Sequence, residues 1–315
     1  MPRSESADVV VVGTTCLDVK ARPLAPVQPG ISNPARIRLC PGGTGRNVAE
    51  NLARLGVRVS LLSTVGNDLL GQRLLENTAR AGVDTSRVLR TSDHYSATYL
   101  ALYTQDVKSG YLLDDVTQLK AATPEYLFAQ KKLFRNAKMV VLDGNLDTET
   151  IAAAIDLAKK SGTPVAVDPA TVRRAYALRP YLSEFAMITP NVAEAEALMD
   201  RKITGGEDAL EVAREIVAQG VEIVVISMAD DGLVYATSQG YGQGHGRIGA
   251  IRCEVEDWTG AGDALSAAVI YGLLNDMPVD DCMRLGVAAA TLALKSIESV
   301  NPDMSLEQLY ANMVI

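Results

Sequence analysis

The sequence predicts an α/β protein with a doubly wound, mostly parallel sheet and helices on both faces. Short β-branched runs alternate with amphipathic helical stretches along most of the chain. The runs are apolar almost throughout, which is typical of strands that helices cover on both faces. Several helical stretches end in a glycine, the residue that most readily closes a helix in the left-handed conformation: Gly56, Gly82, Gly162 and Gly220.

Taken in chain order, the apolar runs give six predicted strands, at residues 8–13, 59–65, 138–143, 164–168, 185–189 and 223–227. The predicted helices between and after them cover residues 47–55, 71–81, 148–160, 192–199 and 209–218. Ligands of such sheets bind beyond the carboxyl ends of the strands. Polar residues stand at or after those ends: Asp18, Asp143, Asp168, Asn191 and Ser227.

Two segments, 16–41 and 94–116, break this alternation and show no helical period. Residues 96–103 alternate as a strand does. We expect residues 1–315 to form one domain, with these two segments joined as a small β lid that excludes water from the site; a decorative hairpin is the alternative. The apolar residues from Tyr99 to Tyr103 lack a covering helix, which predicts a homodimer in which two lids meet.

Composition excludes several classes of function. The net charge of −8 argues against a nucleic-acid or membrane-surface partner, and aromatic residues make up 5% of the chain, too few for stacking platforms. No apolar run approaches the roughly 20 residues that span a bilayer, so we expect a cytoplasmic protein. Four dispersed cysteines and two histidines offer no zinc spacing or histidine triad, and buried reduced thiols are expected.

Residues 257–263, which read DWTGAGD, carry the strongest chemical signal. A glycine-rich turn that opens a helix leaves the N–H groups of Gly260, Ala261 and Gly262 free to hold an anion. Asp263 lies in the first turn of that helix, where a carboxylate can take the proton of an attacking hydroxyl. This arrangement suits phosphoryl transfer; the alternative is that Asp263 merely caps the helix.

A second glycine-rich entry to a helix covers residues 41–47, PGGTGRN. Gly42 and Gly43 permit a close backbone approach or a hinge. Asn47 offers a donor and an acceptor to a pair of sugar hydroxyls. The alternative is a simple turn.

Asn191 and Glu194 lie three residues apart at the start of a predicted helix, on one face. An amide and a carboxylate there would orient the waters of a bound Mg²⁺ ion, which keeps several waters and few direct protein ligands. The alternative is an Asn N-cap with Glu at the third helical position.

The glycines of residues 240–246 do not form a dinucleotide fingerprint, because their spacing is wrong and no helix follows. They indicate a loop between two strands. The chain also lacks the G-x4-G-K-[ST] sequence of P-loop enzymes.

The three motifs at 41–47, 191–194 and 259–263, in this order, resemble those of the PfkB family of ribokinase-like sugar and nucleoside kinases. The resemblance extends from about residue 9 to about residue 290. It implies a ribokinase-like fold with a β lid, ATP and Mg²⁺ as cofactors, K⁺ in some members, and a small nucleoside or sugar as substrate.

The resemblance also implies residue roles. Asp263 would be the general base, and Gly260, Ala261 and Gly262 the anion hole. The residues that hold the ribose 2′- and 3′-hydroxyls would be Asp18, Gly42, Gly43 and Asn47. Two further substrate residues, Asn33 and Asp115, would lie near the base or the lid. ATP would bind near Asn191, Glu194, Ser227, Gly232, Gly260 and Gly262. Mg²⁺ would bind there too, with a water molecule between the ion and Glu194. A monovalent cation would bind at Asp257 and Thr259.

Within the family, the segments 32–34, 41–49, 112–116 and 301–305 are similar to those of pseudouridine kinases. This implies ATP-dependent phosphorylation of the ribose 5′-hydroxyl of pseudouridine. The alternatives are a kinase of another ribonucleoside or a free sugar such as ribose, and a catalytically idle sugar-binding protein, which would need no base at Asp263. A nicotinamide-dependent oxidoreductase would need the missing fingerprint.

The chain departs from the family pattern at two positions. Trp258 stands where Thr is common, although its side chain need not face the ligand. Ala229 stands two residues after Ser227, where Gly is usual, and puts a methyl group near the path of the nucleotide phosphates. We also expect the helix dipole to keep Asp263 ionised.

Overall fold

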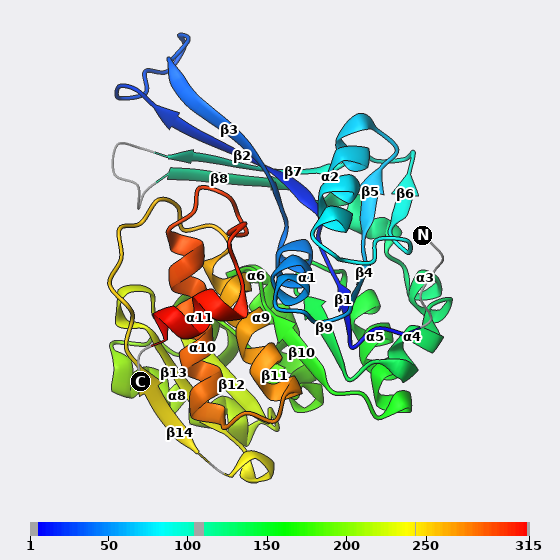
Figure 1. Cartoon of the computed structure of the whole chain (residues 1–315), viewed down its shortest axis with the longest axis vertical. Coiled ribbons are helices and arrows are strands. Elements are labelled where there is room, and N and C mark those ends of the chain that lie inside the picture. The colour runs from blue at the N-terminus through cyan, green and yellow to red at the C-terminus, as the bar shows by residue number, and fades with distance from the viewer. Residues whose placement is uncertain (1–5, 104–109, 243, 314–315) are drawn as a thin grey trace.

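In the computed structural model, which describes residues 6–313 except 104–109 and 243, an eight-stranded sheet forms the centre of the molecule (Figure 1). Its order is β14-β13-β12-β11-β10-β9-β1-β4, and the strands from β12 to β4 in that order run parallel. The antiparallel β13 and β14 complete one edge. The strands are β1 (Val9–Val12), β4 (Val59–Leu62), β9 (Met139–Asp143), β10 (Val165–Asp168), β11 (Met187–Ile188), β12 (Ile223–Ser227), β13 (Leu233–Thr237) and β14 (His245–Ile248).

Both faces of this sheet are buried, as its apolar strands predict. In β1, Val10 and Val12 join one core cluster, while Val9 and Val11 join the other. The first cluster packs under α3 (Pro124–Phe128), α4 (Lys131–Asn136), α5 (Thr148–Ser161), α6 (Val172–Leu178), α7 (Val192–Met199) and α8 (Gly206–Ala218). The second packs under α1 (Thr44–Arg54), α9 (Ala261–Leu274) and α10 (Val279–Leu294), with α11 (Leu306–Asn312) against α10. The predicted doubly wound fold is therefore confirmed.

A separate four-stranded sheet, which we call the lid sheet, projects away from the central sheet (Figure 1). Its order is β3-β2-β7-β8, with β2 and β7 parallel and the outer pairs antiparallel. The strands are β2 (Cys16–Pro23), β3 (Ala35–Gly42), β7 (Ala97–Tyr103) and β8 (Gly110–Asp115). They come from the two segments that the sequence singles out, of which residues 104–109 lie outside the described part.

Some predicted boundaries are wrong. The predicted strand 59–65 is divided into β4 and β5 (Thr64–Gly66), which leaves the central sheet to pair with β6 (Leu89–Thr91). The predicted helix at 71–81 begins earlier, as α2 (Leu69–Arg80), because the Asp68 carboxylate accepts a hydrogen bond from Gly71 N at 2.7 Å. The loop predicted at 240–246 ends earlier, because β14 begins at His245, and Gln243 in this loop is outside the described residues.

Short 3₁₀ turns complete the chain, at Thr117–Ala121, Arg179–Glu184, Ala229–Asp231 and Gln239–Tyr241. Among the described residues, no helix has both the length and the apolar character needed to cross a bilayer. Three of the four cysteines are buried without disulfides, whereas Cys253 is partly exposed, so the expectation of buried thiols is wrong for that residue.

Candidate active site

The start of α9 is built to leave its backbone N–H groups available. The N-cap Gly260 has φ +86° and no side chain to bond them, and a Cβ at this position would lie 1.8 Å from Ser299 O. At Gly262 a Cβ would meet no atom within 4 Å, so this turn faces open space. The first N–H groups of a helix have no partner inside it. The turn therefore has the geometry of an anion site.

The side chain of Asp263 does not cap α9. Its Oδ2 instead accepts a hydrogen bond from Asn47 Nδ2 at 2.8 Å, which joins the two glycine-rich motifs. Burial raises the pKa of Asp263 to about 7, and the negative charges of Asp143 and Asp18 add to this, while the Asn47 hydrogen bond opposes it. The expectation that the helix dipole keeps Asp263 ionised is thus wrong, because loss of solvation outweighs the dipole.

Asp18 lies at the base of the lid sheet and is 2% exposed. It accepts hydrogen bonds from Cys16 Sγ at 3.3 Å and from Ser299 Oγ, and burial raises the pKa of its carboxyl. A Cβ at Gly42 would lie 2.2 Å from each of the Asp18 carboxylate oxygens. Gly42 therefore makes room for Asp18.

Asn47 is held in place by the residue before it. Arg46 Nη1 donates to Asn47 Oδ1 at 2.9 Å and to Pro41 O at 2.8 Å, and its guanidinium also pairs with Glu50. Gly43, the N-cap of α1, has φ +98°, and a Cβ there would lie 2.6 Å from Thr14 O. The 41–47 motif is more than a turn, because it fixes the amide that reaches Asp263.

Two strand-end carboxylates, to which the sequence assigned no role, complete the cluster. Asp143 and Asp168 are paired in register across β9 and β10. Asp143 Oδ2 accepts from Thr14 N at 2.8 Å and Gly45 N at 3.2 Å. Burial, then the negative charges of Glu194 and Asp263, raise the pKa of Asp168 well above its usual value. Each of the two residues is the last of its strand, a sequence signal that marks this edge of the sheet but does not show that the two are paired.

Asn191 and Glu194 form a capping box, the alternative that the sequence left open. Glu194 N donates to Asn191 Oδ1 at 3.0 Å and Asn191 N to Glu194 Oε2 at 2.9 Å. Burial raises the pKa of Glu194, against the hydrogen bonds from Asn191. A carboxylate such as Glu194, whose charge raises the pKa of a neighbouring carboxyl, suits a Mg²⁺ ion with water ligands. The described residues contain no group of three or more His, Cys, Asp or Glu side chains that would hold a metal directly.

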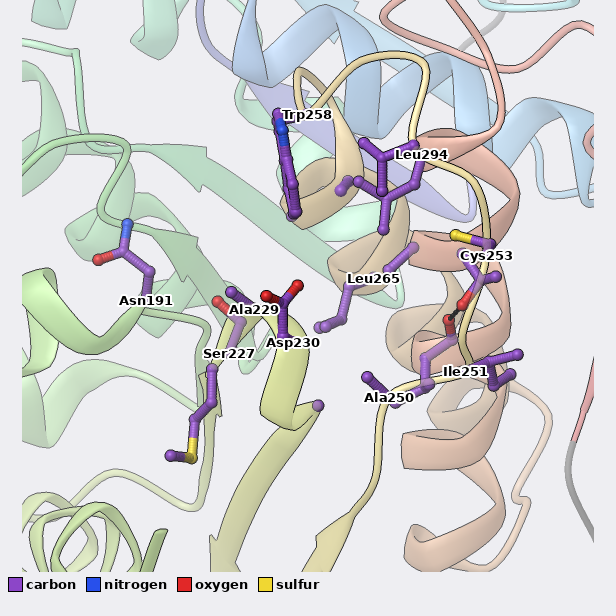
Figure 2. A pocket seen from close by; sticks show the side chains of 18 of the residues that line it. Asn191, Ser227, Ala229, Asp230, Ala250, Ile251, Cys253, Trp258, Leu265 and Leu294 are labelled. Carbon is purple, nitrogen blue, oxygen red and sulfur yellow. Dashed lines mark hydrogen bonds between the residues drawn. The ribbon is translucent and has the colours of Figure 1, made fainter. Parts of the chain in front are cut away.

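A pocket of about 950 Å³ lies beside the N-terminus of α9 (Figure 2). Asn191, Ser227 and Gly232 line it together with Ala261 and Gly262, so most predicted nucleotide residues meet there, whereas Glu194 and Gly260 are not among the lining residues. Its walls were not foreseen from the sequence: Ile251, Cys253, Val255, Leu265, Val287 and Leu294.

Both departures from the family pattern line this pocket. Figure 2 shows Trp258 with its ring along the cavity wall. Ala229 has φ +48°, a left-handed conformation that favours glycine. The usual glycine at this position is thus explained by the backbone.

Two predicted substrate residues are not brought to the Asp18–Asn47–Asp263 cluster. Asn33 lies in the exposed loop between β2 and β3, where its amide bonds to backbone groups of Gln28 and Ile31. Asp115, at the end of β8, accepts from Thr117 Oγ1 at 2.7 Å and lines a separate cavity of about 180 Å³.

Asp257 is 3% exposed, and its partners include cationic side chains of the chain itself. Lys20 Nζ lies 3.2 Å from Asp257 Oδ1 and Arg22 Nη2 lies 3.5 Å from Oδ2, while Thr259 N donates to Oδ1 at 2.9 Å. Burial opposes ionisation, but the Lys20 charge and the Thr259 hydrogen bonds outweigh it, so the pKa of Asp257 lies below its usual value. Sequence reasoning missed Lys20. Residues two apart in a strand lie on the same face of the sheet, so Lys20 could have been placed on the face that carries Asp18.

A known protein family matches nearly the whole chain. The model of the pfkB family of carbohydrate kinases matches residues 6–305. The chain belongs to this pfkB family. As a pfkB kinase of sugars or nucleosides, it is an ATP-dependent phosphotransferase with an alcohol group as acceptor.

Individual relatives span almost the whole pfkB chain. It is 33% identical over 298 residues to the pseudouridine kinase of Escherichia coli (strain K12), covering 95% of this chain and 94% of that protein. It is 28% identical to the guanosine-inosine kinase of Exiguobacterium acetylicum, covering 92% and 95%. An E. coli protein described as ribokinase II, in complex with ATP and Mg²⁺, shares the fold with a TM-score of 0.83 at 17% identity, covering 97% and 98%.

Proposed function

We propose that this kinase transfers the γ-phosphoryl group of ATP to the ribose 5′-hydroxyl of pseudouridine, giving pseudouridine 5′-phosphate and ADP. The observation that carries the proposal is the 33% identity to a pseudouridine kinase over 95% of the chain. The sequence segments 32–34 and 301–305 support the same substrate.

The geometry supports a division of the site into two halves. Ala261 and Gly262 line the pocket, whereas Asp263 is not among its lining residues and bonds to Asn47. The nucleotide lies in the pocket and the acceptor beside Asp263, with the turn between them. The N–H groups of Gly260, Ala261 and Gly262 hold the oxygens of the phosphoryl group in transfer.

Asp263 orients the 5′-hydroxyl and accepts its proton as the new O–P bond forms. Because the transition state of phosphoryl transfer is loose, positioning matters more than base strength. Asn47 and Asp18, for which Gly42 makes room, hold the ribose hydroxyls. ATP supplies the phosphoryl group, and Mg²⁺ neutralises its charge.

Asn191, Ser227 and Gly232 would contact the nucleotide, and Glu194 with Asp168 would hold Mg²⁺ through its water ligands. The position of these residues supports these roles. Asn191, Ser227 and Gly232 line the pocket, and Glu194 lies close enough to Asp168 for its charge to raise the pKa of Asp168.

The test is an assay of ADP release with pseudouridine, uridine, adenosine, guanosine, ribose and fructose 6-phosphate, with the product identified by mass and by phosphorus NMR. We expect pseudouridine to give the highest kcat/KM. The Asp263→Asn variant, prepared in the same way, controls for contaminating kinases. A higher kcat/KM for guanosine or ribose would overturn the substrate, and no ADP release with any acceptor would favour an idle binding protein.

We further propose a homodimer through the lid sheet. Residues that are paired across neighbouring strands of the lid sheet lie on the same face. One face therefore carries two rows of paired residues, and each row has large, exposed apolar residues at its two ends. Ile37, Leu39, Tyr111 and Leu113 are each at least 60% exposed. The opposite face carries Asp18 and Lys20. Because exposed apolar patches of this kind mark interfaces, a second copy of the same face is the partner that fits.

A further inference from the structure

Lys20 is a buried cation on the face of β2 that carries Asp18. It is 3% exposed, and its ammonium lies 3.2 Å from Asp257 Oδ1 and 3.2 Å from Ile297 O. One carboxylate oxygen and one backbone carbonyl oxygen are also the ligands that hold a dehydrated alkali cation in proteins. The ammonium thus fills a site of the chemical kind that a monovalent metal ion would use.

Asp257 connects this charge to the turn before α9. Thr259 N donates to Asp257 Oδ1, the same oxygen that faces Lys20, at 2.9 Å. Thr259 directly precedes Gly260, where the proposed anion hole begins. On the other oxygen, Tyr103 OH lies 3.1 Å away and Arg22 3.5 Å away. The Lys20–Asp257 pair therefore fixes the segment that enters the anion hole.

The residues present do not fit the monovalent cation expected at Asp257 and Thr259. Asp257 Oδ1 already has a cation and an N–H group as partners, and a metal ion bound there would lie against the Lys20 ammonium. Like charges at such a distance in a buried site repel strongly. Either Lys20 or a metal ion occupies this position.

We infer that the Lys20 ammonium takes the place of a monovalent cation beside residues 257–262, so that phosphoryl transfer by this kinase needs no added K⁺. The inference rests on the proposed role of the 260–262 turn, but on no particular acceptor. It also explains how the lid sheet is tied to the anion hole, since Lys20 comes from β2 and its partners from the loops that flank α9 and α10.

The experiment compares the whole protein with three variants in buffers whose cation is either K⁺ or tetramethylammonium. Wild type should have equal kcat/KM in both. Lys20→Ala removes the charge and leaves space, so its kcat/KM should fall by about tenfold or more without K⁺ and recover when K⁺ is added. Lys20→Met fills the space without charge and should stay low in both. Arg22→Ala keeps Lys20 on Asp257 and should stay indifferent to K⁺.

A second readout needs no substrate. K⁺ should raise the Tm of Lys20→Ala but not that of wild type or Lys20→Met, because binding to the native state stabilises it. If the enzyme is inactive on pseudouridine, this measurement still decides the inference. A K⁺ requirement of wild type would overturn it, even if every variant fails to fold. So would a folded Lys20→Ala variant that K⁺ neither activates nor stabilises.

Discussion

Asn47 Nδ2 donates a 2.8 Å hydrogen bond to Asp263 Oδ2 and so joins two residues that are 216 positions apart in the chain. The bond brings the first turn of α1 against the first turn of α9. Arg46 orients the Asn47 amide from behind, and Gly260 shapes the backbone before Asp263. The proposed base is thus positioned by groups from both glycine-rich motifs.

Replacing Asp263 by Asn should remove the proton acceptor while keeping a partner for Asn47. We expect kcat to fall by at least ~10²-fold, within the range for acid–base groups, with little change in KM. Steady-state kinetics measure both. Asp156→Asn, at a partly exposed carboxylate of α5, is the matched control. A variant with near wild-type turnover would contradict the assignment.

The raised pKa of Asp263 predicts a pH dependence of stability. In the unfolded chain Asp263 ionises near its ordinary pKa of 3.8, but in the substrate-free native protein near 7. Between these values the native state binds more protons, so this group's stabilising contribution is full below about pH 4 and is lost as the pH rises through about 7. Asp263→Asn should therefore gain Tm relative to wild type above about pH 8 and not at about pH 4. An equal difference at both pH values would speak against the shift.

The same pKa predicts the activity profile. Asp263 accepts a proton when it is ionised, so kcat/KM should fall as the pH drops below about 7, with one proton taken up. Wild-type rates across this range measure the effect. A rate independent of pH down to about 5 would mean that bound ligands keep Asp263 ionised or that it is not the base.

Asp18 and Asn47 predict discrimination for ribose hydroxyls. A site built to bond a hydroxyl rejects analogues without it, because buried polar groups are then left unpaired. We expect 2′-deoxy substrates to lose on the order of 10²-fold or more in kcat/KM. Equal use of ribo- and deoxyribonucleosides would refute these roles.

Ala229 predicts a stabilising substitution in the pocket. Its φ of +48° costs an L-residue roughly 1 kcal/mol, which glycine avoids. Ala229→Gly should raise the free energy of unfolding by up to about that amount and lower the KM for ATP by removing a methyl group from the pocket wall. Urea unfolding and ATP titration test this. Gly232→Ala is the opposite case, because its Cβ would lie 2.0 Å from Ile248 O. A weaker affinity of Ala229→Gly for ATP would contradict the prediction.

Adjacent residues of β8 test the dimer. Leu112 and Leu113 are each 60% exposed and point to opposite faces of the lid sheet. Sedimentation should give twice the 33.5 kDa chain mass for wild type. Leu113→Glu should dissociate the dimer, and Leu112→Glu should not. A wild-type monomer at micromolar concentration, or equal behaviour of the two variants, would reject the interface.

Local patterns in the sequence were enough to predict the features that depend on neighbouring residues. Apolar runs and helical periods predicted the doubly wound sheet, and the glycine-rich turns indicated where two helices, α1 and α9, begin. These signals are local because strand and helix periods, and the left-handed residues at turns, depend on neighbouring residues. The DWTGAGD motif itself indicated phosphoryl transfer, and the family resemblance then supplied the kinase family and its class of substrate.

The tertiary structure decided the partners of charged groups. No spacing in the sequence places Lys20 on Asp257, Ser299 on Asp18, or Asp143 beside Asp168, because these contacts join strands and loops that meet through the order of the sheets. Local reasoning also failed for the pKa of Asp263. It considered the dipole of the helix that contains Asp263, whereas the pKa is raised by burial under elements from other parts of the chain. The ionisation state of each group at this site depends on its burial and on its charged and hydrogen-bonding neighbours, which only the folded structure brings together.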